Sequence, residues 1–229
     1  MSNHYLVIPA RSGSKRIPGK NLKEIAGLPM IAHPIMATID SKVFTEIFVS
    51  TDSQDVAKIA NDFGAKTPFI RSAELSDDFT PTIPVIKDAI LKISQIQPDD
   101  YVCCIYPTSV FLKPMVLVES KAQLRFLSER QFLVSITSFD YPIQRALFRN
   151  EQDDLNFLNP EFSQSRSQDL IETFHDAAQF YWAKAETWLN ADNVFLNARG
   201  LYINRNDVQD IDTIEDFNRA ELILKFRGK

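Results

Sequence analysis

Short apolar runs alternate with longer amphipathic segments through the first two-thirds of the chain. The apolar runs are rich in β-branched and aromatic residues, which predicts strands at 5–10, 46–51, 67–70, 101–106 and 132–139. The segments between them have helical spacing, which predicts helices at 29–41, 53–64, 82–94 and about 114–129. Because the strand runs show little alternation, we expect a mainly parallel sheet covered by helices on both faces. The pattern therefore predicts a three-layer, Rossmann-like α/β fold.

This pattern stops near residue 140. The stretch 149–169 is polar, contains a proline and several asparagines, and shows no clear period. Because long irregular stretches are uncommon inside compact domains, we expect residues 140–170, approximately, to form a small projecting lobe that binds a partner. A last helix should begin just after Asp212 and end near Phe226, since Thr213 and Asp216 have the spacing of a capping box. We expect one domain, residues 1–229, with the lobe inserted in it.

A further strand is expected in the segment "FHDAAQFYW", residues 174–182. Strict alternation would place His175, Ala177, Gln179 and Tyr181 on one face and Asp176, Phe180 and Trp182 on the other. One of these faces is a candidate for binding polar ligands. The simpler interpretation of Phe180 and Trp182 is core packing, and the adjacent pair of His175 and Asp176 is more typical of a structural role than of a general base.

Charge is unevenly distributed along the chain. The net charge of −5 argues against a general nucleic-acid-binding protein. Residues 11–23 contain five cations and no acid, whereas residues 207–216 contain five acids and no base. One cluster of each sign is what a protein needs to bind a polyanion together with a divalent metal.

The cysteines and the apolar runs of the sequence predict the redox state of the thiols and the location of the protein. Cys103 and Cys104 are adjacent on a predicted strand and point to opposite faces, which indicates reduced, buried thiols and a reducing compartment. The sequence shows no signal peptide and no apolar run long enough to cross a bilayer. We therefore expect a cytoplasmic protein with no membrane partner.

The loop "RSGSKRIPGKN", residues 11–21, directly follows the first predicted strand. It is not a Walker P-loop, because five residues separate Gly13 from Gly19 and Lys20 is followed by Asn21. It also lacks the third glycine of the dinucleotide-binding fingerprint. Its position at the carboxyl end of a strand and its three cations Arg11, Lys15 and Lys20 nevertheless favour a triphosphate over a solvated basic loop.

Several stretches, in the same order, resemble the cytidylyltransferases that activate sialic acids and related nine-carbon acids. They are "IPARSGSKRIPGKN", "STDS", "FIRSAELSDDFTPTIPV", "YPTS", "RSQD" and "QDIDTIEDF", and Ser12 is the one clear departure in the first of them. The stretches 138–147 and 174–189 resemble one branch of that family, the pseudaminic acid cytidylyltransferases. The resemblance implies a nucleotidyltransferase fold.

The implied reaction transfers CMP from CTP to the anomeric hydroxyl of pseudaminic acid, releasing pyrophosphate, for glycosylation of a bacterial surface glycan or flagellin. Alternatives are the same chemistry on sialic or legionaminic acid and, with less support, on the eight-carbon acid Kdo. A nucleotide-sugar glycosyltransferase and a non-catalytic nucleotide sensor are alternatives from other classes. Retention of Lys20, Asp210 and Asp212 together argues against a sensor.

The resemblance also implies roles for individual residues. Nucleotide contacts are expected from Arg11, Ser14, Lys15, Lys20, Asn21, Arg71 and Thr82, with Lys20 also catalytic. Thr80 and Thr82 are equally well explained as caps of the helix that begins there. The sugar acid is expected to contact Tyr106, Gln144, Arg145, Arg166, His175 and Gln179. In the family, the segment around 140–170 helps to form a homodimer and approaches the neighbouring active site.

Asp210 and Asp212 are the expected metal ligands and complete the catalytic set. They lie two residues apart, so both carboxylates project to one face of an extended segment. Hard oxygen ligands of this kind suit Mg²⁺, which binds through one or two carboxylates together with substrate phosphates. An acidic helix entrance is the alternative interpretation, and it accounts for Glu215 and Asp216 better than for Asp210.

Overall fold

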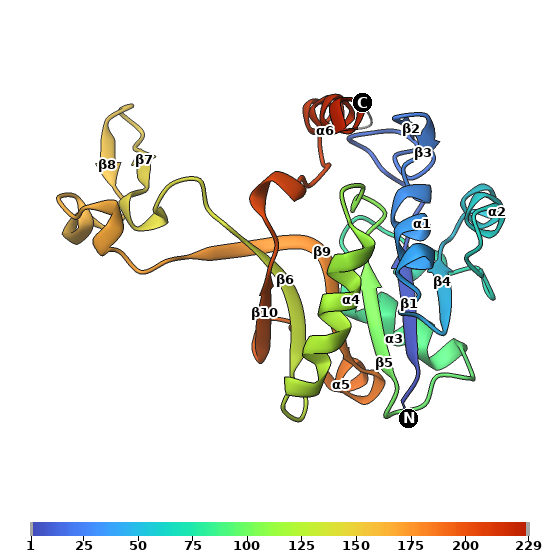
Figure 1. The fold of residues 1–229 in the computed structure, drawn as a ribbon. Coiled ribbons are helices and arrows are strands. Elements are labelled where there is room, and N and C mark those ends of the chain that lie inside the picture. Colours follow the sequence, from blue (N-terminus) through green and yellow to red (C-terminus); the bar gives the residue numbers. More distant parts are fainter. Residues whose placement is uncertain (1, 228–229) are drawn as a thin grey trace.

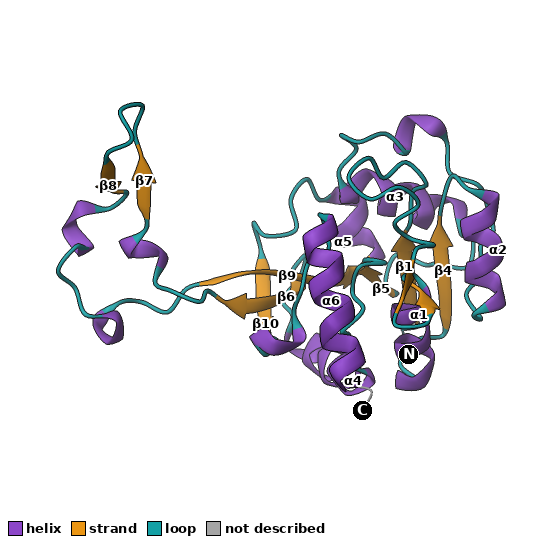
Figure 2. Cartoon of the chain, turned by 90° about the horizontal axis from the view of Figure 1, so that it is seen from above, coloured by secondary structure: helices purple, strands orange, loops and turns teal. Residues whose placement is uncertain are grey.

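The computed structural model describes residues 2–227 and contains a six-stranded sheet with helices on both faces (Figures 1 and 2). The strand order is β10–β6–β9–β5–β1–β4. The strands are β1 (His4–Pro9), β4 (Glu46–Ser50), β5 (Tyr101–Ile105), β6 (Phe132–Ser138), β9 (Phe174–Lys184) and β10 (Ala198–Tyr202). Pairing is parallel except at β9, which runs antiparallel to both β5 and β6. The predicted three-layer α/β class with a mainly parallel sheet is confirmed.

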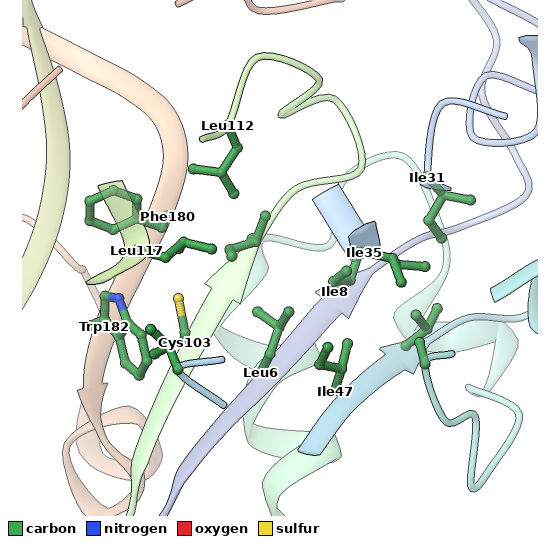
Figure 3. Packing of buried hydrophobic residues seen from close by; sticks show 14 of the residues in the cluster. Leu6, Ile8, Ile31, Ile35, Ile47, Cys103, Leu112, Leu117, Phe180 and Trp182 are labelled. Atoms are coloured by element: carbon green, nitrogen blue, oxygen red, sulfur yellow. The ribbon is translucent and has the colours of Figure 1, made fainter. Parts of the chain in front are cut away.

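The helices are α1 (Ala32–Ser41), α2 (Gln54–Asp62), α3 (Thr82–Lys92), α4 (Pro114–Gln123), α5 (Ala185–Asn190) and α6 (Ile214–Arg227). Five of the helices cover the two faces of the sheet, and the buried residues of α6 pack in a separate cluster. Apolar residues of α1, α2 and α4 pack on one face of the sheet, in a cluster that includes Leu6, Ile35 and Trp182 (Figure 3). Residues of α3 and α5 pack on the other face against Val7 and Tyr181. Each fully buried apolar side chain of this kind contributes about 1.5–3 kcal/mol.

Several sequence predictions differ from the structure. The helix predicted at about 114–129 ends at Gln123 and is followed by a 3-10 turn, Leu124–Phe126. In place of the regular strand predicted at 67–70, the structure has two isolated bridges, Phe48 with Lys66 and Thr51 with Ile70. Pro68 lacks an N–H group, which explains why a ladder does not extend there. The helix predicted from residue 29 begins at Ala32, after a short hairpin of β2 (Glu24–Ile25) and β3 (Leu28–Pro29). Strand β10 has no counterpart among the predicted strands.

Residues 139–173 leave the sheet between β6 and β9 and stand well away from it (Figures 1 and 2). This projecting lobe contains a small antiparallel hairpin of β7 (Leu147–Arg149) and β8 (Leu155–Phe157), together with three 3-10 turns. Both strands of the hairpin are exposed along their whole length. The polar and aperiodic sequence of the segment agrees with its having no core of its own.

A bulge interrupts β9 and makes the predicted alternation wrong across it. Pairing with β6 shifts so that Val134 faces Tyr181 while Ile136 faces Asp176. Ala178 adopts a left-handed φ of 51°, and the Ser135 hydroxyl accepts hydrogen bonds from the next two backbone N–H groups. Extra residues in one strand rotate the side chains that follow, so Asp176 lies on the same side as Tyr181 rather than opposite it.

Two smaller expectations are confirmed within residues 2–227. Thr213 and Asp216 form a reciprocal capping box at the start of α6, with Thr213 N–H donating to Asp216 and Asp216 N–H donating to the Thr213 hydroxyl. Cys103 and Cys104 are buried and unpaired, and burial raises the pKa of both thiols. No described helix is both long and apolar enough to cross a membrane.

Candidate active site

A cavity of about 520 Å³ opens at the carboxyl edge of the parallel strands. Its walls are the loop after β1, the segment 71–82, the turn after β5, the β9 bulge and the acidic segment before α6. Figure 1 shows α6 and the β2–β3 hairpin at this same edge of the sheet. Open α/β sheets bind ligands at this position, because loops from neighbouring strands converge there. The cavity is therefore the candidate active site.

All the residues predicted for nucleotide and metal lie in its lining: Arg11, Ser14, Lys15, Lys20, Asn21, Arg71, Thr82, Asp210 and Asp212. The loop that follows β1 is fixed at both ends. The buried Asn21 donates its side-chain N–H to the carbonyl of Arg11 at 2.8 Å, which closes the loop across its base. Gly19 adopts a φ of 63°, and its carbonyl accepts from the N–H groups of Leu22 and Lys23. Glycine suits this left-handed position because it has no Cβ.

Ser12, which departs from the family pattern, also has a definite contact. Its backbone N–H and its hydroxyl each donate to Asp52 at 2.7 Å. Burial alone would raise the pKa of Asp52, but hydrogen bonds, chiefly from Ser12, together with the charge of Arg71 hold this pKa below its ordinary value. Asp52, at the start of the loop after β4, therefore acts as an anionic anchor for the loop after β1.

Four cations of the loop face two carboxylates. Arg11 and Lys15 each lie 2.5 Å from an oxygen of Asp78. On the opposite side, Arg16 and Lys20 lie 3.1 and 3.5 Å from Asp212. The fifth cation of the cluster, Lys23, instead lies over the ring of Phe217, 5.2 Å from its centroid. The cavity thus brings together the basic and acidic clusters of the sequence.

Arg71 lies in the wall of the cavity and is 4% exposed. Its Nε donates to the Ser76 hydroxyl at 3.1 Å. Burial lowers the pKa of this guanidinium, and the charge of Asp52 partly offsets that effect. A buried cation with N–H groups left over for a ligand is suited to bind an oxygen-rich partner.

Thr80 and Thr82 have different surroundings. The Thr80 hydroxyl and N–H both donate to Asp77 at 2.6 Å, which stabilises the turn before α3. Thr82, the first residue of α3, makes no cap; its hydroxyl lies 2.5 Å from the Tyr106 hydroxyl. A residue predicted for the nucleotide and one predicted for the sugar are therefore in direct contact.

Asp210 and Asp212 both line the cavity. Loss of hydration raises the pKa of Asp210, and repulsion from Asp212 raises it further. Lys20 opposes this effect, and its Nζ donates to the carbonyl of Ile211, between the two acids, at 2.9 Å. Two crowded carboxylates are hard oxygen ligands for a divalent cation.

A metal site at this point would need more than protein ligands. Residues 2–227 contain no group of three or more His, Cys, Asp or Glu side chains that could hold a metal ion. Mg²⁺ commonly binds through one or two carboxylates and completes its shell with water and substrate phosphates. The pair therefore fits Mg²⁺ bound together with a phosphorylated ligand.

Tyr106 is the predicted sugar-binding residue that lines the cavity. Its ring packs edge-on against Tyr181, with 5.6 Å between centroids. The Tyr181 hydroxyl donates to Asp176, and the other Asp176 oxygen accepts from the N–H of Ala178 at 2.8 Å. Burial raises the pKa of both tyrosines, so both remain protonated donors. The hydrogen bonds of Asp176 thus fix the bulge at Ala178, which is part of the cavity lining.

The other residues predicted for the sugar lie outside the cavity lining: Gln144, Arg145, Arg166, His175 and Gln179. The first three belong to the projecting lobe; Gln144 and Arg145 donate to lobe carbonyls, and Arg166 pairs with Asp169 at 2.7 Å. His175 is exposed at the lobe's base. Gln179 is buried and donates to the carbonyl of Asp207 at 2.5 Å.

Sequence reasoning missed several residues of the lining, among them Asp77, Asp78, Pro107 and Thr108. Asp77 and Asp78 are a visible pair of acids in "LSDDFT", but the sequence does not show which cations they would meet. Pro107 and Thr108 directly follow a predicted strand, and this position at a strand's carboxyl end was a usable signal.

Comparison with known proteins gives the class. The sequence model of the cytidylyltransferase family matches residues 5–140. The chain is 39% identical to pseudaminic acid cytidylyltransferase of Campylobacter jejuni over 222 residues, 96% of this chain and 95% of that protein. It is 46% identical to CMP-N,N'-diacetyllegionaminic acid synthase of Legionella pneumophila over 109 residues, 47% of each protein.

Solved structures share the fold. The structure of CMP:2-keto-3-deoxy-manno-octonic acid synthetase complexed with CTP matches with a TM-score of 0.74 at 17% identity, covering 99% of this chain and 100% of that one. The fold, together with the family match and the similar relative, thus defines a nucleotidyltransferase of the Rossmann-like α/β type. Within that class, the chain belongs to the cytidylyltransferase family and is a CTP-using enzyme. The family predicted from the sequence is confirmed.

Proposed function

We propose that this enzyme transfers CMP from CTP to the anomeric hydroxyl of pseudaminic acid, giving CMP-pseudaminic acid and pyrophosphate. The observation that carries the proposal is the convergence of Arg11, Lys15, Lys20, Asp210 and Asp212 on one cavity. The choice of sugar acid is supported by the Campylobacter jejuni relative, which is similar over almost its whole length.

In the proposed reaction the anomeric oxygen forms a bond to the α-phosphorus of CTP. The bond from that phosphorus to the bridging oxygen breaks, and pyrophosphate leaves with the electron pair. The hydroxyl proton is released to solvent. Transfers of this kind depend mainly on charge neutralisation and in-line positioning. In this proposal Arg11, Lys15 and Lys20 would neutralise the phosphates, and Arg71 and Thr82 would hold the cytidine.

Mg²⁺ is the proposed cofactor, and Asp210 and Asp212 are its proposed ligands. When bound, the ion neutralises phosphate charge and favours ionisation of the attacking hydroxyl. The chain's own contribution is to hold the two carboxylates. Lys20 binds the backbone between them, and the capping box holds the residues that follow.

We propose that Tyr106 and the β9 bulge form the floor of the sugar subsite. The lobe residues Gln144, Arg145 and Arg166 would then act in a homodimer, at the cavity of the neighbouring copy. The lobe carries exposed apolar side chains that are suited to bury on association: Leu147, Phe148, Leu155, Phe157 and Leu158. His175, at the base of the lobe, and the buried Gln179 would support the sugar subsite.

A pyrophosphate-release assay with CTP and Mg²⁺ tests the proposal. Pseudaminic acid should support turnover, with kcat/KM at least about tenfold above that of legionaminic or sialic acid. Legionaminic acid is the second candidate, because the Legionella pneumophila relative is similar over about half the chain. Reactions without a sugar acid are the control. Higher kcat/KM with legionaminic acid would replace the proposed substrate, and no release with any acid would refute the transferase proposal.

A further inference from the structure

Asp78 is a carboxylate in the cavity to which the proposed reaction gives no role. One of its oxygens lies 2.5 Å from the Arg11 guanidinium, and the other lies 2.5 Å from Lys15 Nζ. Contact with Lys15, and then with Arg11, lowers the pKa of Asp78, so it carries its charge at neutral pH. Two cations of the phosphate-facing loop are therefore already bridged by an anion.

The neighbouring acid shows how specific this arrangement is. Asp77 directs its carboxylate into its own loop, where it accepts from the N–H groups of Phe79 and Thr80 and from the Thr80 hydroxyl. Within residues 2–227, by contrast, the hydrogen bonds and ion pairs of the Asp78 carboxylate go to Arg11 and Lys15. Asp77 shapes the turn, and Asp78 is presented to the cations.

We propose that Asp78 is an internal competitor for the triphosphate, and that it sets the affinity of the enzyme for CTP and for pyrophosphate. This inference rests on the proposed function, in which Arg11 and Lys15 bind the phosphates of CTP. A carboxylate bridging two cations with two oxygens takes the place that two phosphate oxygens would otherwise take. Nucleotide must displace it to reach both cations.

A ligand can replace Asp78 in its ion pairs with Arg11 and Lys15. The Lys15 side chain is 82% exposed and that of Arg11 36%, so solvent screens both ion pairs. The loop tip beside Asp78 has little packing to hold it, because Phe79 is 88% exposed. A triphosphate with several charges outcompetes one carboxylate at such a site. Asp78 can then rebind the cations as pyrophosphate leaves, which favours product release.

Titration calorimetry on the full-length protein tests the inference, with CTP, pyrophosphate and cytidine as probes. Asp78→Asn keeps the shape of the side chain and removes its charge. It should bind CTP and pyrophosphate about three- to tenfold more tightly than the wild type, since two exposed ion pairs no longer have to be broken. Cytidine, which has no phosphate, should bind with unchanged affinity.

Glu74→Gln is the matched control. Glu74 lies in the same segment but outside the cavity lining, and its side chain makes no ion pair with the loop cations. It should leave the affinity for CTP within about twofold of the wild type, since its charge is distant and screened. Asp78→Ala should shift affinity in the same direction as Asp78→Asn. A gain of affinity in both Asp78 variants and not in Glu74→Gln supports internal competition.

Unchanged or weaker binding of CTP by both Asp78 variants would overturn the inference. Weaker binding would mean that Asp78 positions Arg11 and Lys15 for the nucleotide, and unchanged binding would mean that it does not affect nucleotide affinity. The proposed function is judged separately. If the wild type binds CTP but releases no pyrophosphate with any sugar acid, the proposed function fails while the binding comparison still decides the role of Asp78. If the wild type binds neither CTP nor pyrophosphate, both are wrong.

Discussion

Lys20 lies against Ile211, although 191 residues separate them in the sequence. Its Nζ donates to the Ile211 carbonyl at 2.9 Å and lies 3.5 Å from Asp212. One lysine therefore connects the loop after β1 to the acidic segment before α6. The proposed phosphate contact and the proposed metal ligands are held in a fixed relation by this contact.

Lys20→Ala should lower kcat/KM for CTP by at least about 100-fold, the size of effect seen when one donor to a developing negative charge is removed. The variant also loses the contact to Ile211, so Lys20→Arg, which can keep a cation there, should recover part of the activity. Initial rates of pyrophosphate release measure both. Lys23→Ala is the control, because Lys23 lies outside the cavity over Phe217 and should retain near-normal kcat/KM. Unchanged kinetics in Lys20→Ala would contradict a role for this cation in the reaction.

Asp212→Asn should lower Mg²⁺-dependent pyrophosphate release by at least about 100-fold while the thermal unfolding midpoint changes little, because the loss concerns the metal and not the fold. The apparent Mg²⁺ concentration for half-maximal rate should rise as well. Glu215→Gln removes an acid in the first turn of α6, outside the cavity lining, and should behave like the wild type. A variant with wild-type rates at low Mg²⁺ would rule out Asp212 as a ligand.

Much of the fold could be predicted because it rests on local signals. Buried strands such as β1 and β5 are continuous apolar runs, and α6 begins at a capping box. Strand β10 could not be recognised, since "ARGLY" combines a charge and a glycine at the edge of the sheet. Its place is determined by pairing with β6, and the pattern within one segment does not contain that information.

The candidate site, too, could be predicted only in part from the sequence. The cations of the loop after β1 and the pair Asp210 and Asp212 were predictable, because each is a compact motif at the end of an element. The ion pairs of Asp78 with Arg11 and Lys15 were not, since the acid lies 67 residues from Arg11 and periodicity says nothing about such contacts. Phe180 and Trp182 share a buried face opposite Tyr181, as predicted. The faces on the two sides of the bulge were matched wrongly, because alternation assumes a regular ladder and the bulge at Ala178 breaks it.

The bulge yields a prediction about stability. Asp176→Ala removes the acceptor for the Tyr181 hydroxyl and for the Ala178 N–H, and should lower the free energy of unfolding by about 1–3 kcal/mol because buried donors are left unpaired. Tyr181→Phe leaves the Ala178 contact intact and should cost about 0.5–1.5 kcal/mol. Urea unfolding measures both. Because both substitutions delete the same Tyr181–Asp176 hydrogen bond, the double variant should lose less than the sum of the two single losses; an additive loss would mean that the two residues stabilise the fold independently of that bond.

His33 gives a prediction about pH. Its ring lies 3.0 Å from the Ile25 carbonyl, under the β2–β3 hairpin. Burial lowers its pKa below the ordinary 6.5, and the hydrogen bond to Ile25 only partly offsets this. As the pH falls below 6.5, the unfolded chain takes up the proton first, so the free energy of unfolding decreases until the folded-state pKa is passed.

His33→Gln should therefore show a smaller loss of unfolding free energy between about pH 7.5 and pH 5.5 than the wild type, measured by urea titration at each pH. Part of the slope should remain, because burial and then Lys121 also lower the pKa of His4. Replacing both histidines with Gln should flatten the dependence further. If the unfolding free energy of His33→Gln fell as much as that of the wild type, or more, protonation of His33 would not destabilise the folded protein. The β2–β3 hairpin would then accommodate the charged ring.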